Sequence, residues 1–231
     1  GGPTSGSFLL TLHGRNFGLS RYTQELGGAG SAATANQVLL GDPAGGQDVP
    51  CPLIQLNHTT ATCSVPSGSG RGKVVKLVQF RFSRDPVAQS VEVSPSQTFH
   101  YDPPVITSIS PSVVPVSPAE DAVVRVRGTS LGVEGMVRIK DSIVTVVSAS
   151  HEEYVVRPQQ GMGTKHNVSI EVGGQSFTLA GAFSYEPPII YSVTPEPPIS
   201  GVSCPTDVCL DARQQTLKVR GRNFGNVDNP T

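Results

Sequence analysis

The sequence predicts an all-β protein built from tandem β-sandwich domains in a rod. Two observations predict this class. A thirteen-residue segment occurs twice at the spacing of one sandwich domain, and short runs of alternating apolar and polar residues recur between turns. The 231 residues include 25 Gly and 20 Pro, and no stretch carries a helical pattern of useful length. We therefore expect many short strands joined by turns.

The repeated segment covers residues 99–111 and 183–195, with seven identical positions and four conservative exchanges. Pro103 and Pro187 lie 84 residues apart, which is the length of a sandwich domain. A solenoid repeat is shorter, at about 20 to 50 residues. Each copy is therefore interpreted as a joint, where one domain ends in a strand, Pro-Pro follows and the next domain begins.

The predicted joints are two short, stiff linkers. Their residues are Tyr101, Asp102, Pro103 and Pro104 in the first, and Tyr185, Glu186, Pro187 and Pro188 in the second. Proline fixes its own φ and pushes the preceding residue toward extended geometry. Neighbouring domains should therefore hold a limited range of angles. The alternative is that the prolines only protect an edge strand.

A second repeat is the turn at residues 14–18, which returns unchanged at 221–225 and in weaker form at 128–132. An alternating run precedes each copy, as expected of a strand with one buried face. The alternation places Leu12, Val126 and Val219 inward and His13, Arg127 and Arg220 outward. The glycines should provide the positive φ of each turn, and Phe17, Leu131 and Phe224 should close the end of each core.

These repeats divide the chain into three predicted domains. Residues 1–102 form a domain that lacks its first strand, 103–186 a complete one with about seven strands, and 187–231 the start of a third. Both ends of the chain are interpreted as cuts from a longer protein. Strands are expected at 10–13, 37–41, 73–82 and 96–101, then at 105–110, 122–127, 136–140, 143–148, 154–157, 167–172 and 175–185. The last is interrupted at Ala180-Gly181, and residues 19–35 should form a long loop.

Composition excludes several classes of protein. The formal net charge of −1 argues against a polyanion-binding surface. No run of about 18 apolar residues occurs, so the sequence predicts no membrane contact within this fragment.

The four cysteines fall into two close pairs, Cys51 with Cys63 and Cys204 with Cys209. An even count with close partners predicts disulfides formed in an oxidising compartment. The alternative is four reduced thiols in a cytosolic protein. A zinc site is disfavoured, because the pairs belong to different domains and neither has the spacing of a metal hook.

Two sequons predict N-glycosylation at Asn57 and Asn167. Together with the cysteine pairs, they favour secretion.

No set of residues predicts catalysis, a cofactor or a metal site, so we expect no enzyme. The five histidines (His13, His58, His100, His151 and His166) are scattered. Residues 161–165 depart from the order of a phosphate-binding loop, and 68–72 are interpreted as a flexible turn. Glu152-Glu153 is interpreted as a solvated pair. The joints offer one carboxylate each, Asp102 and Glu186, which is far fewer oxygens than calcium requires.

The repeated motifs resemble those of the IPT/TIG family of immunoglobulin-like domains found in plexins, growth-factor receptors and some transcription factors. P-x-I-x-S-I-x-P lies at 104–111, and its second copy at 188–195 keeps the same pattern with Val for the second Ile. The G-x-N-F-G turns, the spacing of Cys51 and Cys63, and the F-x-Y domain ends also carry the resemblance. It implies the sandwich fold strongly and function weakly. The turn at 128–132 departs from the pattern, and 103–186 has no cysteine.

The resulting hypothesis is a non-enzymatic piece of a larger extracellular or cell-surface protein, acting as a stiff spacer and protein-binding array. Its expected partners are other proteins, including copies of itself and neighbouring domains, together with N-linked glycans and no nucleic acid. One alternative is an intracellular or nuclear, DNA-associated scaffold, with Arg15, Arg125, Arg127 and Arg222 as a basic strip. Another is a carbohydrate-binding accessory module, although the chain has no Trp for sugar stacking.

Overall fold

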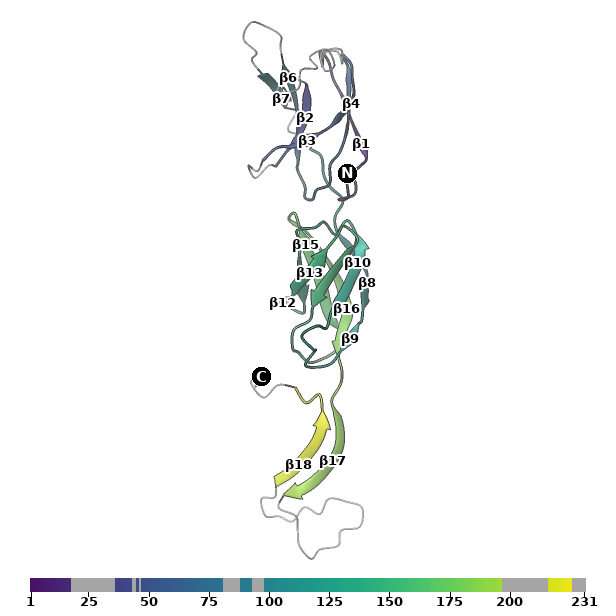
Figure 1. Ribbon diagram of the computed structural model, residues 1–231, viewed down its shortest axis with the longest axis vertical. Helices are drawn as coiled ribbons and strands as arrows, with labels where there is room; N and C mark the ends of the chain where they lie inside the picture. Colours follow the sequence, from purple (N-terminus) through teal and green to yellow (C-terminus); the bar gives the residue numbers. More distant parts are fainter. Residues whose placement is uncertain are drawn as a thin grey trace, which may run out of the picture.

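The protein is all-β. The computed structural model describes residues 1–17, 36–42, 45, 47–80, 88–92, 98–196 and 216–225, and these contain strands but no helix. Figure 1 shows two sandwiches and a final strand pair following one another along one long axis. We call them the N-terminal sandwich (described residues up to 101), the central sandwich (105–185) and the C-terminal strand pair.

The N-terminal sandwich packs a three-stranded sheet, β1-β5-β4, against a four-stranded sheet, β3-β2-β6-β7. The strands are β1 (Leu9–His13), β2 (Gln37–Gly41), β3 (Val49–Cys51), β4 (Leu53–Leu56), β5 (Thr60–Ser64), β6 (Val74–Phe80) and β7 (Ala88–Glu92). Alternate residues of β2 and β6 enter the core, where Val38, Leu40, Val75 and Leu77 are at most 3% exposed.

The central sandwich packs β13-β14-β10-β8 against β12-β11-β15-β16-β9. Its strands are β8 (Val105–Ser110), β9 (Val113–Val114), β10 (Val124–Thr129), β11 (Met136–Ile139), β12 (Ser142–Ile143), β13 (Thr145–Ala149), β14 (Glu153–Arg157), β15 (His166–Val172) and β16 (Gln175–Tyr185). Tyr154, Leu131 and Phe183 are fully buried in its core. This core forms without a cysteine, so apolar burial alone holds the two sheets together.

The two sandwiches share one strand order. Strands β4, β5 and β1 of the first correspond to β13, β14 and β10 of the second, and β3, β2, β6 and β7 correspond to β12, β11, β15 and β16. One difference lies at a sheet edge: β10 pairs with both β14 and β8, whereas β1 pairs with β5 alone among the described strands.

The C-terminal strand pair consists of β17 (Ile189–Glu196) and β18 (Thr216–Arg222), which pair antiparallel. The prediction that Val219 points inward and Phe224 closes a core is wrong for the described structure, because the two side chains are 44% and 52% exposed. No second sheet among the described residues covers this pair, and alternation buries a side chain only where such a sheet exists. The equivalent Val126 and Leu131 are both fully buried, as predicted.

The second glycines of two repeated turns, Gly132 and Gly225, have the predicted positive φ, at 66° and 92°. The sequence did not indicate that Asn16, Ser130 and Asn223 are left-handed as well, with φ of 63°, 53° and 62°. Asparagine adopts this conformation more readily than most residues. The first glycine of each turn serves close approach instead: a Cβ at Gly128 would collide with the Val105 carbonyl oxygen.

Most predicted strands form, with three differences. β7 was not predicted, and the described part of 96–101 makes only single bridges at Phe99 and Tyr101. β16 runs through Ala180-Gly181 without ending, because the register shift there is accommodated as a bulge with Gly181 at φ 62°. The predicted loop at 19–35 lies outside the described residues.

Candidate functional site

The first joint, residues 101–104, is enclosed by contacts between the N-terminal and central sandwiches. Gln175 Nε2 at the start of β16 donates to the Tyr101 carbonyl oxygen at 3.2 Å. His151 Nδ1 lies 3.0 Å from Thr4 Oγ1. Thr4 and Gln175 are 1% and 4% exposed, so the contact excludes water from both polar side chains. A buried hydrogen bond of this kind stabilises one relative orientation of the two sandwiches.

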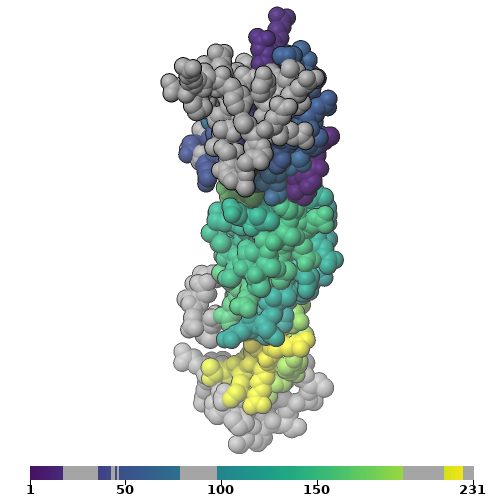
Figure 2. Space-filling view, turned by 45° about the horizontal axis from the view of Figure 1, so that its top comes forward, coloured from purple at the N-terminus to yellow at the C-terminus, as the bar shows by residue number. Residues whose placement is uncertain are grey.

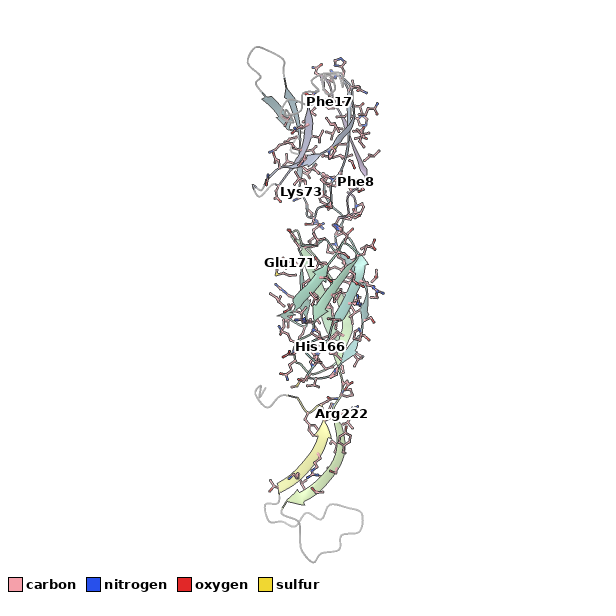
Figure 3. All side chains as sticks on the ribbon, viewed as in Figure 1. Phe8, Phe17, Lys73, His166, Glu171 and Arg222 are labelled. Atoms are coloured by element: carbon pink, nitrogen blue, oxygen red, sulfur yellow. A yellow bond between two sulfur atoms is a disulfide. The ribbon has the colours of Figure 1, made fainter. Side chains whose placement is uncertain are left out.

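Two glycine turns meet beside these hydrogen bonds. A Cβ at Gly173, in the β15–β16 turn, would lie 2.6 Å from Gly70 N and 2.7 Å from Gly70 Cα. Both are backbone atoms that cannot move aside like a flexible side chain. The sandwiches therefore approach closely enough that only glycine fits at Gly173. Figure 3 shows the facing ends, with Phe8 and Lys73 on the N-terminal side and Glu171 on the central side, and in Figure 2 the two sandwiches abut.

The end of each sandwich is built in the same way around a buried tyrosine. The Tyr101 hydroxyl donates to Pro66 O and the Tyr185 hydroxyl to Gln159 O, both at 2.8 Å. The backbone bonds also match: Tyr101 N and Tyr185 N donate to Gly70 O and Gly163 O, and Asp102 N and Glu186 N donate to Gly2 O and Val114 O. Burial raises the pKa of both tyrosines.

The second joint, residues 185–188, repeats one contact of the first. At the first joint Ser69 packs 3.8 Å from where a Cβ of Gly132 would lie. At the second joint Met162, the counterpart of Ser69, lies 2.7 Å from the Cβ position of Gly225, the counterpart of Gly132. In each case the loop beside the tyrosine touches the last glycine of the next turn.

A polar contact also joins the second joint to the C-terminal strand pair. Asn223 Nδ2 donates to Glu186 Oε2 at 2.9 Å and to Pro187 O at 3.3 Å. Asn223 therefore has two roles, since it also supplies the left-handed residue of its turn. Among the proline positions, Pro104 is buried, whereas Pro103, Pro187 and Pro188 are exposed.

Sequence reasoning missed the loops that complete both joints. The segments 68–70 and 161–163 were not related to each other, yet a Cβ at Gly68 or Gly161 would strike the Tyr101 or Tyr185 ring. The shared G-x-G pattern upstream of a tyrosine is the signal that could have paired them. His151 and Gln175 left no such signal, because their partners lie 147 and 74 residues away.

Among the described residues, no three His, Cys, Asp or Glu side chains lie close enough together to hold a metal ion. His100 Nδ1 accepts from Gly72 N at 2.8 Å, and His151 belongs to the first joint. The joint carboxylates Asp102 and Glu186 lie in different joints. No helix in the described part of the chain could span a membrane.

The predicted disulfide between Cys51 and Cys63 is present, joining β3 to β5 inside the N-terminal core. Cys51 is 2% exposed and Cys63 is fully buried. Cys204 and Cys209 lie outside the described residues.

Both sequon asparagines belong to turns or strand ends. Asn57 Oδ1 accepts hydrogen bonds from Thr59 N, Thr59 Oγ1 and Thr60 N, within the β4–β5 turn. Asn167, in β15, is exposed, and its Oδ1 accepts from Gly181 N at 3.0 Å. In both residues these contacts engage the amide oxygen and not Nδ2, which is the atom that carries a glycan.

The arginines of β10 are held by an acidic neighbour rather than forming an uncompensated basic strip. Arg125 Nη1 and Arg127 Nε contact the two carboxylate oxygens of Glu153 at 2.9 and 2.7 Å. The Arg127 hydrogen bond is the main cause of a lowered pKa at Glu153. Glu153 is therefore ion-paired, contrary to its interpretation as one of two solvated acids.

Residues 104–185 match the family model of the IPT/TIG domain. The match covers the central sandwich and begins at the motif of residues 104–111 that carried the resemblance. This family consists of non-enzymatic immunoglobulin-like domains. No curated protein matches the chain.

Among solved structures, the full extracellular region of plexin A4 matches 80% of this chain at 16% identity and a TM-score of 0.39. The chain spans 17% of that protein. A Bacteroides thetaiotaomicron protein of unknown function matches 41% of the chain at 22% identity and a TM-score of 0.32, over 24% of its own length. SGBP-B, from a xyloglucan utilization locus in Bacteroides uniformis, matches 79% at 14% identity and a TM-score of 0.31, over 46% of its length.

Proposed function

We propose that this chain is a non-enzymatic spacer and protein-binding segment of an extracellular or cell-surface protein. The domains would be residues 1–102, 103–186 and 187–231, with the first lacking its first strand and the third incomplete. Their role would be to hold binding surfaces at fixed separation and angle. The chain would bind other proteins, and its two sequons would carry N-linked glycans.

The repeated joint is the observation that supports this proposal. A flexible tether needs no buried contact between neighbouring domains. Here the side chains of Gln175 and Thr4 are buried, and each makes a hydrogen bond to the opposite sandwich. At the second joint the Met162–Gly225 contact takes the place of Ser69–Gly132, and the Asn223 amide adds a hydrogen bond to Glu186. Contacts at both joints would keep successive domains at limited angles, which suits a spacer better than a hinge.

The buried disulfide supports the secretory location. Disulfides persist in oxidising compartments and are rare in the cytosol. Peptide mapping of the protein purified from a eukaryotic secretion host, without reduction, should find Cys51 linked to Cys63 and Cys204 linked to Cys209. The same sample should lose mass at Asn57 and Asn167 on treatment with an N-glycosidase. Free thiols and unmodified asparagines would remove the argument for secretion.

Gly173 and Gly174, which are neighbours in the β15–β16 turn, provide a test of whether the first joint is held by contact. Gly173 and Gly174 both have positive φ, so alanine at either strains the turn by about 1 kcal/mol. Only Gly173 faces the N-terminal sandwich, since a Cβ at Gly174 meets nothing within 4 Å. In small-angle X-ray scattering, Gly173→Ala should therefore broaden the distribution of maximum dimensions, while Gly174→Ala should match the wild type. Equal profiles for all three proteins would contradict a contact-locked joint.

No specific observation favours the two alternatives. A DNA-associated scaffold would need free cations, but Arg125 and Arg127 are paired with Glu153. A carbohydrate-binding module would present exposed aromatic faces, and Tyr101, Tyr154 and Tyr185 are all at most 7% exposed. Tyr191 is the exposed tyrosine of the described residues, at 64%.

A further inference from the structure

We propose that a pocket of the central sandwich binds an acidic side chain, Asp or Glu, of a partner protein. The inference deepens the proposed protein-binding role and rests on it. The pocket has a volume of about 330 Å³ and lies at the end of the sandwich nearest the second joint, where Gly161, Met162 and Tyr185 line it. Ligand pockets in proteins begin at about this size.

The lining combines an apolar floor with a polar rim that holds one positive charge. Val116, Ile139 and Val144 are at most 8% exposed and form the floor together with Tyr185. Ser142, Gln159 and Gln160 supply hydroxyl and amide groups to the rim, and Lys140 is the one charged residue of the lining. Lys140 is exposed and forms no ion pair with any described residue. A carboxylate beside an apolar group matches this combination.

The N-terminal sandwich has a pocket at the equivalent place, with a carboxylate already supplied. It has a volume of about 190 Å³ and is lined by Leu40, Gly68 and Tyr101, the counterparts of Ile139, Gly161 and Tyr185. Two further lining residues, Lys73 and Asp42, form an ion pair with 2.8 Å between Nζ and Oδ2. The lysines of the two pockets come from different positions, because Lys73 corresponds to His166 in the strand register. The smaller pocket pairs its lysine internally, whereas no acidic residue lines the larger one beside Lys140.

This comparison favours a protein ligand over a sugar. In the N-terminal pocket an aspartate side chain pairs with the lysine, so a partner's Asp or Glu at Lys140 would form the same kind of ion pair from a different position of the lining. The one aromatic residue of the larger pocket, Tyr185, is 7% exposed and has no open face for stacking a sugar ring. Binding of an acidic monosaccharide is therefore the competing result that the experiment must distinguish from binding of a peptide carboxylate.

The experiment is an NMR titration of the ¹⁵N-labelled 231-residue chain. The probe is the acetylated, amidated dipeptide Leu-Glu, the matched control is Leu-Gln, and glucuronic acid represents the sugar. We expect saturable shifts at Lys140, Ser142 and Met162 with Leu-Glu, at a Kd on the order of 1 mM because one exposed ion pair contributes little. Leu-Gln and glucuronic acid should bind at least about fivefold more weakly.

A matched pair of variants separates the pocket from general charge. Lys140 has φ of 60°, and asparagine tolerates this backbone, so Lys140→Asn removes the charge and leaves the turn intact. It should weaken Leu-Glu binding about fivefold. Lys165→Asn, at another exposed lysine with φ of 57° outside the lining, should leave binding unchanged. Absence of saturable shifts, equal binding of Leu-Gln, or tighter binding of glucuronic acid would overturn the proposal. None of these results would alter the scattering test of the spacer.

Discussion

At the scale of single residues, the buried tyrosine at the end of each sandwich links the core to the joint. Tyr101 packs edge-on against Phe99, and Tyr185 packs edge-on against Phe183, at centroid distances of 4.9 and 5.2 Å. Each hydroxyl then fixes a loop by donating to a backbone carbonyl. The F-x-Y motif thus places a core ring and a joint-forming hydroxyl two residues apart on the same face of the strand.

Removing the Tyr185 hydroxyl should destabilise the central sandwich. Tyr185→Phe leaves the Gln159 carbonyl without its donor, at a cost of about 1 kcal/mol in the free energy of unfolding. Urea denaturation at neutral pH measures this cost. Tyr191→Phe is the control, because Tyr191 is 64% exposed. Equal losses in both variants would show that the hydrogen bond contributes nothing.

The raised pKa of Tyr185 adds a dependence on pH. Burial favours the neutral hydroxyl in the folded state, so the unfolded chain loses its proton first, at a pH of about 10. The contribution to stability is complete below that pH and is lost as pH rises through the folded pKa. Tyr185→Phe should therefore flatten the decline of the unfolding free energy above pH 10.

Glu153 should contribute stability that acid removes. Its pKa is lowered in the folded state, mainly by the Arg127 hydrogen bond, so its contribution is present above the unfolded pKa and is lost as pH falls through the folded one. Unfolding free energies of wild type and Glu153→Gln should differ slightly at pH 7 and converge at pH 2. Glu152→Gln, one residue away and exposed, should track the wild type at both values. A difference that persists in acid would contradict the ion-pair explanation.

Sequence alternation predicted burial well at this scale where a second sheet exists. Val126 is fully buried beside exposed Arg127, whereas the same pattern leaves Val219 exposed. The positive φ predicted for the glycines is present at Gly132 and Gly225, but the sequence did not indicate that Ser130 and Asn223 share it. Only the backbone distinguishes the role of Gly128, which is close approach, from that of Ser130.

At the scale of elements, the disulfide is an addition to a sandwich that can form without it. The central sandwich has no cysteine, yet it has the same strand order as the N-terminal one. Cys51 and Cys63 join strands of opposite sheets in the N-terminal core. The bridge therefore increases stability locally without determining the topology.

The double variant Cys51→Ala, Cys63→Ala should lower the stability of the N-terminal sandwich alone. The bridge closes a loop with a sequence separation of 12, and loops of this length are stabilised by about 3 kcal/mol. Hydrogen exchange read separately at Val38 and Val126 should show loss of protection only at Val38. Reduction of the wild type should give the same result, and unchanged protection at Val38 would refute it.

Most elements could be predicted because their signal is local. β6 and β10 alternate clearly, and the hairpin between β15 and β16 turns at a Gly-Gly pair. β7 was missed because Ala-Gln-Ser-Val-Glu has little alternation of apolar and polar residues. The strand forms by pairing with β6, which the local sequence does not indicate. The bulge in β16 was predicted as a break, because a glycine within a strand is compatible with either a bulge or the end of the strand.

At the scale of the whole molecule, the first copy of the thirteen-residue repeat lies where the N-terminal and central sandwiches meet, and the structure adds the contacts between them. The repeat contains Tyr101 and Pro104 of the first joint but neither Gln175 nor His151, which come from distant turns of the next sandwich. Their contacts depend on how two folded units dock, and no local pattern encodes docking. Stiffness was predicted from Pro-Pro alone, whereas the structure also places side-chain hydrogen bonds and a close approach of two glycine turns at the first joint.

Residual dipolar couplings measured on the intact chain test the central claim, which is that the first joint is locked. Amides of β2 and β6 report on the N-terminal sandwich, and amides of β10 and β15 report on the central one. A locked joint should give one alignment tensor of equal magnitude and orientation for both sets in the frame of this structure. Tensors of clearly different magnitude would mean that the sandwiches reorient independently and that the joint is not locked.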